Sequence, residues 1–224
     1  MYTFLHNSFM TSKPIGGTTT RQQMKEDNMI DFDDGPQGSG DSGPWINWHA
    51  REKRDGSIGS RSFSLRDEDG STDITAKMKK GVAFDIGSLK TGWCFSNGVT
   101  GVAPQWEWNE SPAKFTVKQP PDIGSDRWKK GFSIRVAVDK NNAATWSQAG
   151  SGAWSGLVHL MKAVKADGGS GEVVVAKMSE VEEVEFPKGG TSAPIFTVVK
   201  WGDAPECLKE AALDVVDDDD DAEF

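Results

Sequence analysis

Alternating apolar and polar positions predict that the body of this chain is mainly β. The clearest case is 132–138, where Phe132, Ile134 and Val136 share one side while Ser133 and Arg135 face the other way. A second alternating stretch, 82–95, is interrupted at 87–88, and we expect a β-bulge there. The pattern is typical of a sheet with one buried face.

One segment has helical periodicity instead. Ala153, Leu157, Leu160, Met161 and Val164 form an apolar stripe that repeats every three to four residues. The glycines at 168–169 supply a stop signal, so we expect a helix over 153–166.

The order of these elements favours a five-stranded OB-type barrel with one helix between strands 3 and 4. A β-sandwich with an inserted helix is the alternative, since element order alone does not separate the two. The expected strands are 45–66, 82–95, 130–138, 172–186 and 195–201.

Composition divides the chain into a disordered N-terminal segment (1–44), an OB-fold nucleic-acid-binding domain (45–202) and a short helix with an acidic C-terminal tail (203–224). The net charge of −9 is distributed unevenly, because 202–224 contributes −9 and 1–44 contributes −3, leaving +3 for 45–201. The body is therefore mildly basic, and any binding to a polyanion must come from local patches.

The same composition argues against several classes of protein. We find no apolar run of about 20 residues and no secretory signal pattern, so we expect a cytoplasmic protein without a membrane partner. His6, His49 and His159 lack metal-ligand spacing, and Cys94 has no histidine near it in the sequence. We therefore expect no enzyme activity, no catalytic residue, no cofactor and no metal site.

Tryptophan is the unusual aromatic choice here, with nine copies against one tyrosine. Trp106 and Trp108 fall on one side of an extended segment, about 7 Å apart, where two successive bases could stack. An apolar lid on the barrel is the other interpretation of this pair. Trp128 lies among Arg127, Lys129 and Lys130, which favours exposure, and Trp45 is expected at the surface or rim.

Basic residues that are expected in loops, or on the strand between them, could follow a phosphate backbone beside these indoles. Solvated surface cations are the alternative for each residue taken alone. The candidates are Arg51, Lys53, Arg54, Arg61, Arg66, Lys77, Lys79 and Lys80.

The chain ends in an acidic run closed by a terminal Phe. Such a run is normally solvated, but Phe224 with its free carboxylate suits capture by a partner that has an apolar pocket beside basic residues. A solubilising tail competes with this docking interpretation. The candidate partner-binding residues are Asp217, Asp218, Asp219, Asp220, Asp221, Glu223 and Phe224.

Together, the expected OB body, the exposed aromatics and the ending 217–224 resemble the single-stranded DNA-binding proteins of tailed phages and bacteria. Glu223 stands where the common bacterial ending has Pro. The resemblance implies sequence-independent binding of single-stranded DNA in phage replication, recombination or repair, within the bacterial host cytoplasm. It also implies a tail that competes with DNA and recruits replication or recombination proteins, and it is compatible with a homo-oligomer.

Two other classes stay open at this point. A carbohydrate-binding β-sandwich also uses exposed tryptophans, and it predicts binding that is insensitive to salt. A structural or assembly protein of a virion predicts stable oligomers and an acidic tail used only for packing contacts.

Overall fold

The computed structural model describes residues 43–96, 104–122, 127–186 and 189–209. The chain divides into two units, 1–30 and 31–224, and all of the described residues belong to the second. The sequence-based prediction of disorder over 1–44 falls almost wholly outside the described residues. No helix in the described part is long and apolar enough to span a bilayer.

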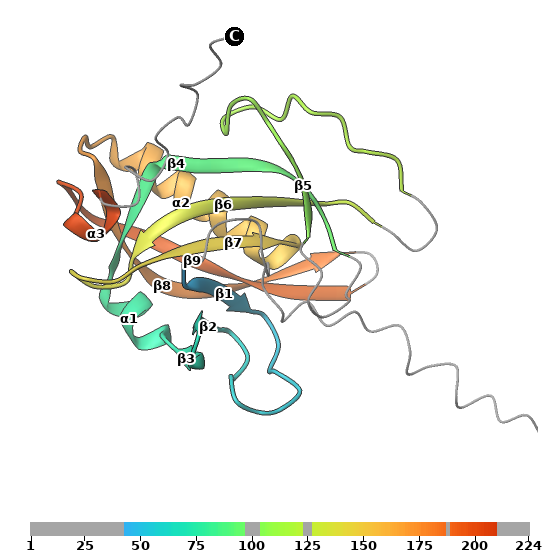
Figure 1. Ribbon diagram of the computed structural model, residues 1–224, viewed down its shortest axis with the longest axis horizontal. Helices are drawn as coiled ribbons and strands as arrows, with labels where there is room; N and C mark the ends of the chain where they lie inside the picture. The colour runs from blue at the N-terminus through green and yellow to red at the C-terminus, as the bar shows by residue number, and fades with distance from the viewer. Residues whose placement is uncertain (1–42, 97–103, 123–126, 187–188, 210–224) are drawn as a thin grey trace, which may run out of the picture. The chain divides into compact units, whose positions relative to one another are not determined.

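The described residues form nine strands and three helices (Figure 1). In chain order these are β1 (Trp45–His49), β2 (Ser62–Asp67), β3 (Gly70–Asp73), α1 (Thr75–Lys80), β4 (Val82–Phe95), β5 (Gln105–Trp108), β6 (Lys129–Ala137), β7 (Ala143–Ala149), α2 (Ser151–Asp167), β8 (Val173–Phe186), β9 (Gly189–Gly202) and α3 (Glu206–Lys209).

All nine strands belong to one curled, open sheet in the order β3-β2-β1-β7-β6-β4-β8-β9, with β5 added beside β4. Strands β4, β6 and β7 form an antiparallel meander, and β8 pairs antiparallel with β4 and β9. β1 runs parallel to β7, and Gln148 extends this pairing because its side-chain amide accepts from Trp48 N and donates to Trp48 O, each at 2.9 Å.

An aromatic core fills one side of the sheet. The Trp146 ring meets the rings of Phe63, Phe84, Phe132 and Phe196 at centroid distances of 5.3, 6.5, 4.8 and 6.0 Å. These four rings come from β2, β4, β6 and β9, so one indole connects distant parts of the sheet.

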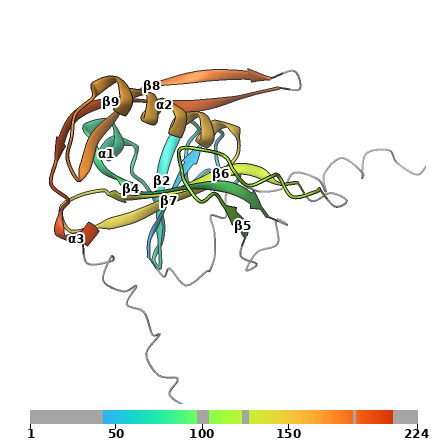
Figure 2. The same ribbon diagram turned by 90° about the horizontal axis from the view of Figure 1, so that it is seen from above.

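Helix α2 covers the same side of the sheet and packs closely on β9 (Figure 2). Gly152 and Gly156 face β9, where an added Cβ would lie 2.5 Å from Ser192 O and 2.6 Å from Pro194 Cγ, respectively. Two small residues one helical turn apart therefore allow the helix to approach the strand.

The mainly β class predicted from the sequence is confirmed, but the strand count is not five. β7 was missed, although Ala144, Trp146 and Gln148 alternate with polar residues, and the predicted first strand is two strands, β1 and β2, joined by a loop. The bulge in β4 lies between Asp85 and Lys90, as its sequence predicts.

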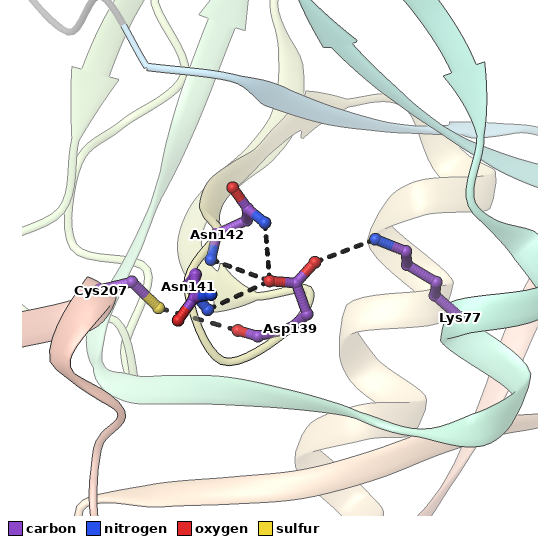
Figure 3. A network of polar contacts seen from close by, with 5 residues as sticks. All are labelled: Lys77, Asp139, Asn141, Asn142 and Cys207. Atoms are coloured by element: carbon purple, nitrogen blue, oxygen red, sulfur yellow. Dashed lines mark hydrogen bonds and ion pairs between the residues drawn. The ribbon is translucent and has the colours of Figure 1, made fainter.

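The short C-terminal helix α3 packs on the other side of the sheet, where Leu208 joins Ala137 and Val173 in a second small core. The β6–β7 turn beside it is organised by Asp139 (Figure 3). Asp139 Oδ1 accepts from Asn141 N, Asn142 N and Asn142 Nδ2, and Oδ2 accepts from Lys77 Nζ at 3.0 Å. The Cys207 thiol lies 3.8 Å from Asp139 O.

These contacts make the turn sensitive to acid. The Lys77 hydrogen bond, followed by the amide donors, lowers the pKa of Asp139 below its ordinary 3.8. A carboxylate with a lowered pKa stabilises the fold above its unfolded pKa and stops doing so as pH falls through the folded value. We expect Asp139→Ala to lower Tm at pH 7, with the gap to the parent protein closing as pH falls below 3.8. Thermal unfolding over a pH series measures this, with Glu68→Ala in the exposed β2–β3 turn as control; a gap that is independent of pH would contradict it.

Candidate nucleic-acid interface

The side of the sheet turned away from α2 is lined by small and polar side chains, and we call it the polar face. Residues paired across neighbouring strands share a face, and the register pairs Ser133 with Ser147 and Asn47 with Ser64. The polar face includes Trp45, Asn47, His49, Ser62, Ser64, Arg66, Asp85, Lys90, Gly92, Cys94, Trp106, Trp108, Lys129, Gly131, Ser133, Arg135, Thr145, Ser147 and Ala149.

Trp106 and Trp108 form the most distinctive feature of this face. Their rings stack on each other with centroids 4.3 Å apart and planes 7° from parallel, and both side chains are half-buried. The inner face of each ring already contacts the other, so the pair does not offer the two separate ring surfaces that one base on each indole would need. A flat ligand can stack only on an outer face of the pair.

Two glycines make room for the stacked pair. Gly92 lies opposite Trp108, and a Cβ there would be 2.2 Å from Glu107 O, so only glycine allows β5 to approach so closely. Gly131, one strand further on, would place a Cβ 2.7 Å from Cζ3 and 2.9 Å from Cη2 of Trp106. Trp106 therefore reaches across β4 and rests on β6.

Lys129 and Cys94 lie next to the pair, since Cys94 is opposite both Trp106 and Lys129 in the register. Burial raises the pKa of the Cys94 thiol to about 12, so this cysteine stays protonated. Burial, and the positive charge of the exposed Arg127 nearby, lower the pKa of Lys129. An anion arriving here would stabilise the charged form of Lys129.

Two further cations follow on the same face. The bulge in β4 reverses the alternation of the strand, so that Leu89 is buried in the core and Lys90 is exposed opposite Ser133. Arg135 lies one position further along that face of β6, and its Nη2 donates to Cys207 O of α3 at 3.4 Å. Asp85, opposite Arg135, is the nearest paired carboxylate on this face, and its Oδ1 accepts from Ser88 N.

Polar side chains also line β1 and β2, but they are buried. Asn47, His49 and Ser64 are 4%, 3% and 0% exposed, and His49 Nε2 lies 2.7 Å from Ser64 Oγ. They form a polar floor rather than a contact surface. Trp45, which was expected at the surface or rim, is half-buried beside this floor, opposite Arg66.

The predicted cluster around Trp128 is divided by the sheet. Trp128 is half-buried against Phe95, with ring centroids 5.7 Å apart, rather than fully exposed. Lys129 belongs to the polar face, whereas Lys130 points to the opposite side. There Lys130 Nζ lies over the rings of Phe115, Trp93 and Trp154, at 4.9, 5.9 and 5.9 Å from their centroids.

The other predicted basic residues do not gather around the tryptophan pair. Arg61 forms an ion pair with Glu183 on β8, so it faces an acidic strand. Arg51, Lys53 and Arg54 lie in the β1–β2 loop, where Lys53 Nζ donates to Ser71 Oγ at 3.5 Å. The prediction that Lys77, Lys79 and Lys80 lie in a loop is wrong, because they belong to α1, where apolar Met78 anchors the helix in the core.

Sequence reasoning did not select Lys90 or Arg135 as site residues. The alternation of the strands could have identified them, because Arg135 faces away from the apolar residues Phe132, Ile134 and Val136, and Lys90 follows the bulge.

The predicted partner-binding residues 217–224 lie outside the described residues. Within the described part, no group of three or more His, Cys, Asp or Glu side chains is placed to hold a metal ion.

Comparisons with protein-family models, with characterised proteins and with solved structures give no significant match to this chain.

The close fit of Trp106 over Gly131 gives a direct test of the stacked pair. We expect Gly131→Ala to displace Trp106, because the new methyl group would overlap its six-membered ring. Two stacked indoles couple their excited states, so the variant should lose the exciton couplet of the pair in far-ultraviolet circular dichroism. Gly202→Ala, at a position with nothing within 4 Å of an added Cβ, is the control. An unchanged couplet in Gly131→Ala would show that the pair does not rest on β6.

Proposed function

We propose that this protein binds single-stranded DNA without sequence preference, on the polar face beside the Trp106–Trp108 pair, in phage DNA replication, recombination or repair. The observation that carries the proposal is the stacked indole pair next to Lys129 and Arg127. Stacking of a base on an aromatic side chain contributes about 1–3 kcal/mol whichever base it is, and nearby cations neutralise the phosphates.

The topology supports this assignment through an OB-type arrangement whose strands differ from those first predicted. β4, β6 and β7 would be strands 1 to 3, α2 the helix that follows strand 3, and β8 and β9 strands 4 and 5. OB folds bind oligonucleotides on the face of strands 2 and 3 and with the loop between strands 1 and 2. In that assignment the polar face of β6 and β7 and the segment that carries Trp106 and Trp108 would correspond to these positions.

The acidic C-terminal segment would compete with DNA and recruit partner proteins. α3, from which this segment continues, packs beside Arg135 on the polar face. The net charge of −9 over 202–224 is attracted to the same cations that would bind phosphates.

The first test is a titration with a poly-dT oligonucleotide at low and moderate salt, followed by intrinsic tryptophan fluorescence. We expect quenching, an affinity that falls as salt rises, and a loss of roughly 5- to 150-fold in affinity for the Trp106→Ala/Trp108→Ala double variant, as expected for about 1–3 kcal/mol. The control Lys79→Gln removes a cation of α1, away from the pair, and should leave affinity unchanged.

Absence of quenching at low salt, with residues 217–224 also deleted, would reject DNA binding. The carbohydrate-binding and structural alternatives would then be tested by salt-insensitive sugar binding and by the oligomeric state.

A second prediction concerns the tail alone. Deletion of 217–224 removes six of the carboxylate side chains and should tighten binding of poly-dT, most strongly at low salt where the attraction is least screened. Replacement of the same segment by a Gly/Ser sequence of equal length separates charge from length. Equal affinity of the parent and both variants at low salt would reject competition by the tail.

A further inference from the structure

We infer that the bound strand runs along β6, from the tryptophan pair to a second phosphate-binding station formed by Lys90 and Arg135. This inference rests on the proposed function. It adds the path of the DNA strand over the sheet and two DNA-binding residues, Lys90 and Arg135, that were not among the candidates from the sequence.

The cations of the polar face are aligned along β6. Lys129 lies beside the tryptophan pair, Lys90 is level with Ser133, and Arg135 follows. Residues two apart on one face of a strand are separated by about 6.6–6.8 Å, so Lys129 and Arg135 are roughly 20 Å apart along β6. At 3.4 Å per nucleotide in a stacked strand, and up to about twice that in an extended one, this distance spans about three to six nucleotides.

Between Lys129 and Arg135 on this face, the Trp106 ring covers Gly131, so the path begins on the tryptophan pair itself. Ser133 comes next along β6, and its small side chain is half-buried. Lys90 is exposed and lies beside Ser133, so it can reach a phosphate next to the one that Arg135 would bind.

Arg135 is held in position without using all of its donors. One hydrogen bond from Nη2 to Cys207 O fixes the guanidinium against α3, and the group has five N–H donors in total. Its backbone N donates to Ser88 Oγ at 2.9 Å within the bulge, so the bulge positions Arg135 as well as Lys90. Asp85 offsets part of this positive charge, but its Oδ1 is bound to Ser88 N at 3.2 Å.

The competing path, across the strands towards β1 and β2, has less to offer a phosphate backbone. Asn47, Ser64 and Ser147 on that route are 4%, 0% and 7% exposed. On the far side, Arg61 already forms an ion pair with Glu183 of the β8–β9 hairpin, whose exposed side chains include Glu180 and Glu185. A polyanion would be repelled there.

The test compares oligonucleotides that can and cannot reach both stations. With d(T)10, which spans the path, Arg135→Gln and Lys90→Gln should each make the negative slope of log K against log salt shallower by about 0.7, the value for one phosphate contact on a single strand. With d(T)2, measured at low salt and millimolar concentration by quenching at the tryptophan pair, neither variant should change affinity.

Two controls separate this inference from simpler explanations. Arg135→Lys keeps the charge and should keep the slope, so a loss of slope in Arg135→Gln alone is not explained by disturbed packing of α3. Lys80→Gln on α1 should have no effect on either oligonucleotide.

The outcomes distinguish the two proposals. Failure of the parent protein to bind d(T)10 would reject the proposed function itself. Binding of d(T)10 that depends on Trp106 and Trp108, with slopes unchanged in both Arg135→Gln and Lys90→Gln, would reject only the path along β6.

Discussion

The packing of Trp146 against four phenylalanine rings is the contact on which the rest of the structure depends. The rings come from β2, β4, β6 and β9, and their centroids lie 4.8–6.5 Å from that of the indole. Aromatic pairs at such distances add about 0.5–1.5 kcal/mol each beyond the area that they bury. Because strands distant in the sheet order meet the same ring, the sheet must curl around it, and the polar face of β6 and β7 lies on the side away from the ring.

The core therefore determines the composition of the polar face. Each strand that contributes a phenylalanine or tryptophan inward presents its next residue outward, since side chains alternate in a strand. Ser133 and Arg135 on β6 and Ser147 on β7 are outward-facing for this reason. Where the alternation alone would place Lys90 in the core, the bulge of β4 reverses it, so a local irregularity adds a cation to the surface.

The periodicity of the chain was sufficient to predict the mainly β class, the bulge in β4 and the helix α2, because each depends on neighbours close in sequence. It was not sufficient for the arrangement of the site. The stacking of Trp106 on Trp108 depends on Gly92 and Gly131, which lie on two other strands. A periodicity within one segment cannot predict that these glycines lie beneath the tryptophan pair. Likewise, the sequence around Arg61 gives no indication of its ion pair with Glu183, because Glu183 lies far away in the sequence on the β8–β9 hairpin. Lys129 and Lys130 are adjacent in sequence, yet a strand places them on opposite faces, so one basic cluster became two separate environments.

This separation bears on how an acidic protein can bind a polyanion. The β8–β9 hairpin carries a group of carboxylates, in which Glu182 pairs with His159 and Glu183 with Arg61. The cations Lys90, Lys129 and Arg135 lie on the other side of the sheet from α2, where Asp85 is paired opposite Arg135. At physiological ionic strength charges are screened over about 8 Å, so a phosphate on β6 responds mainly to these nearest groups. The net charge of −9 thus gives little information about the polar face, and a site of few cations makes stacking on the tryptophan pair the larger share of the binding energy that the proposal requires.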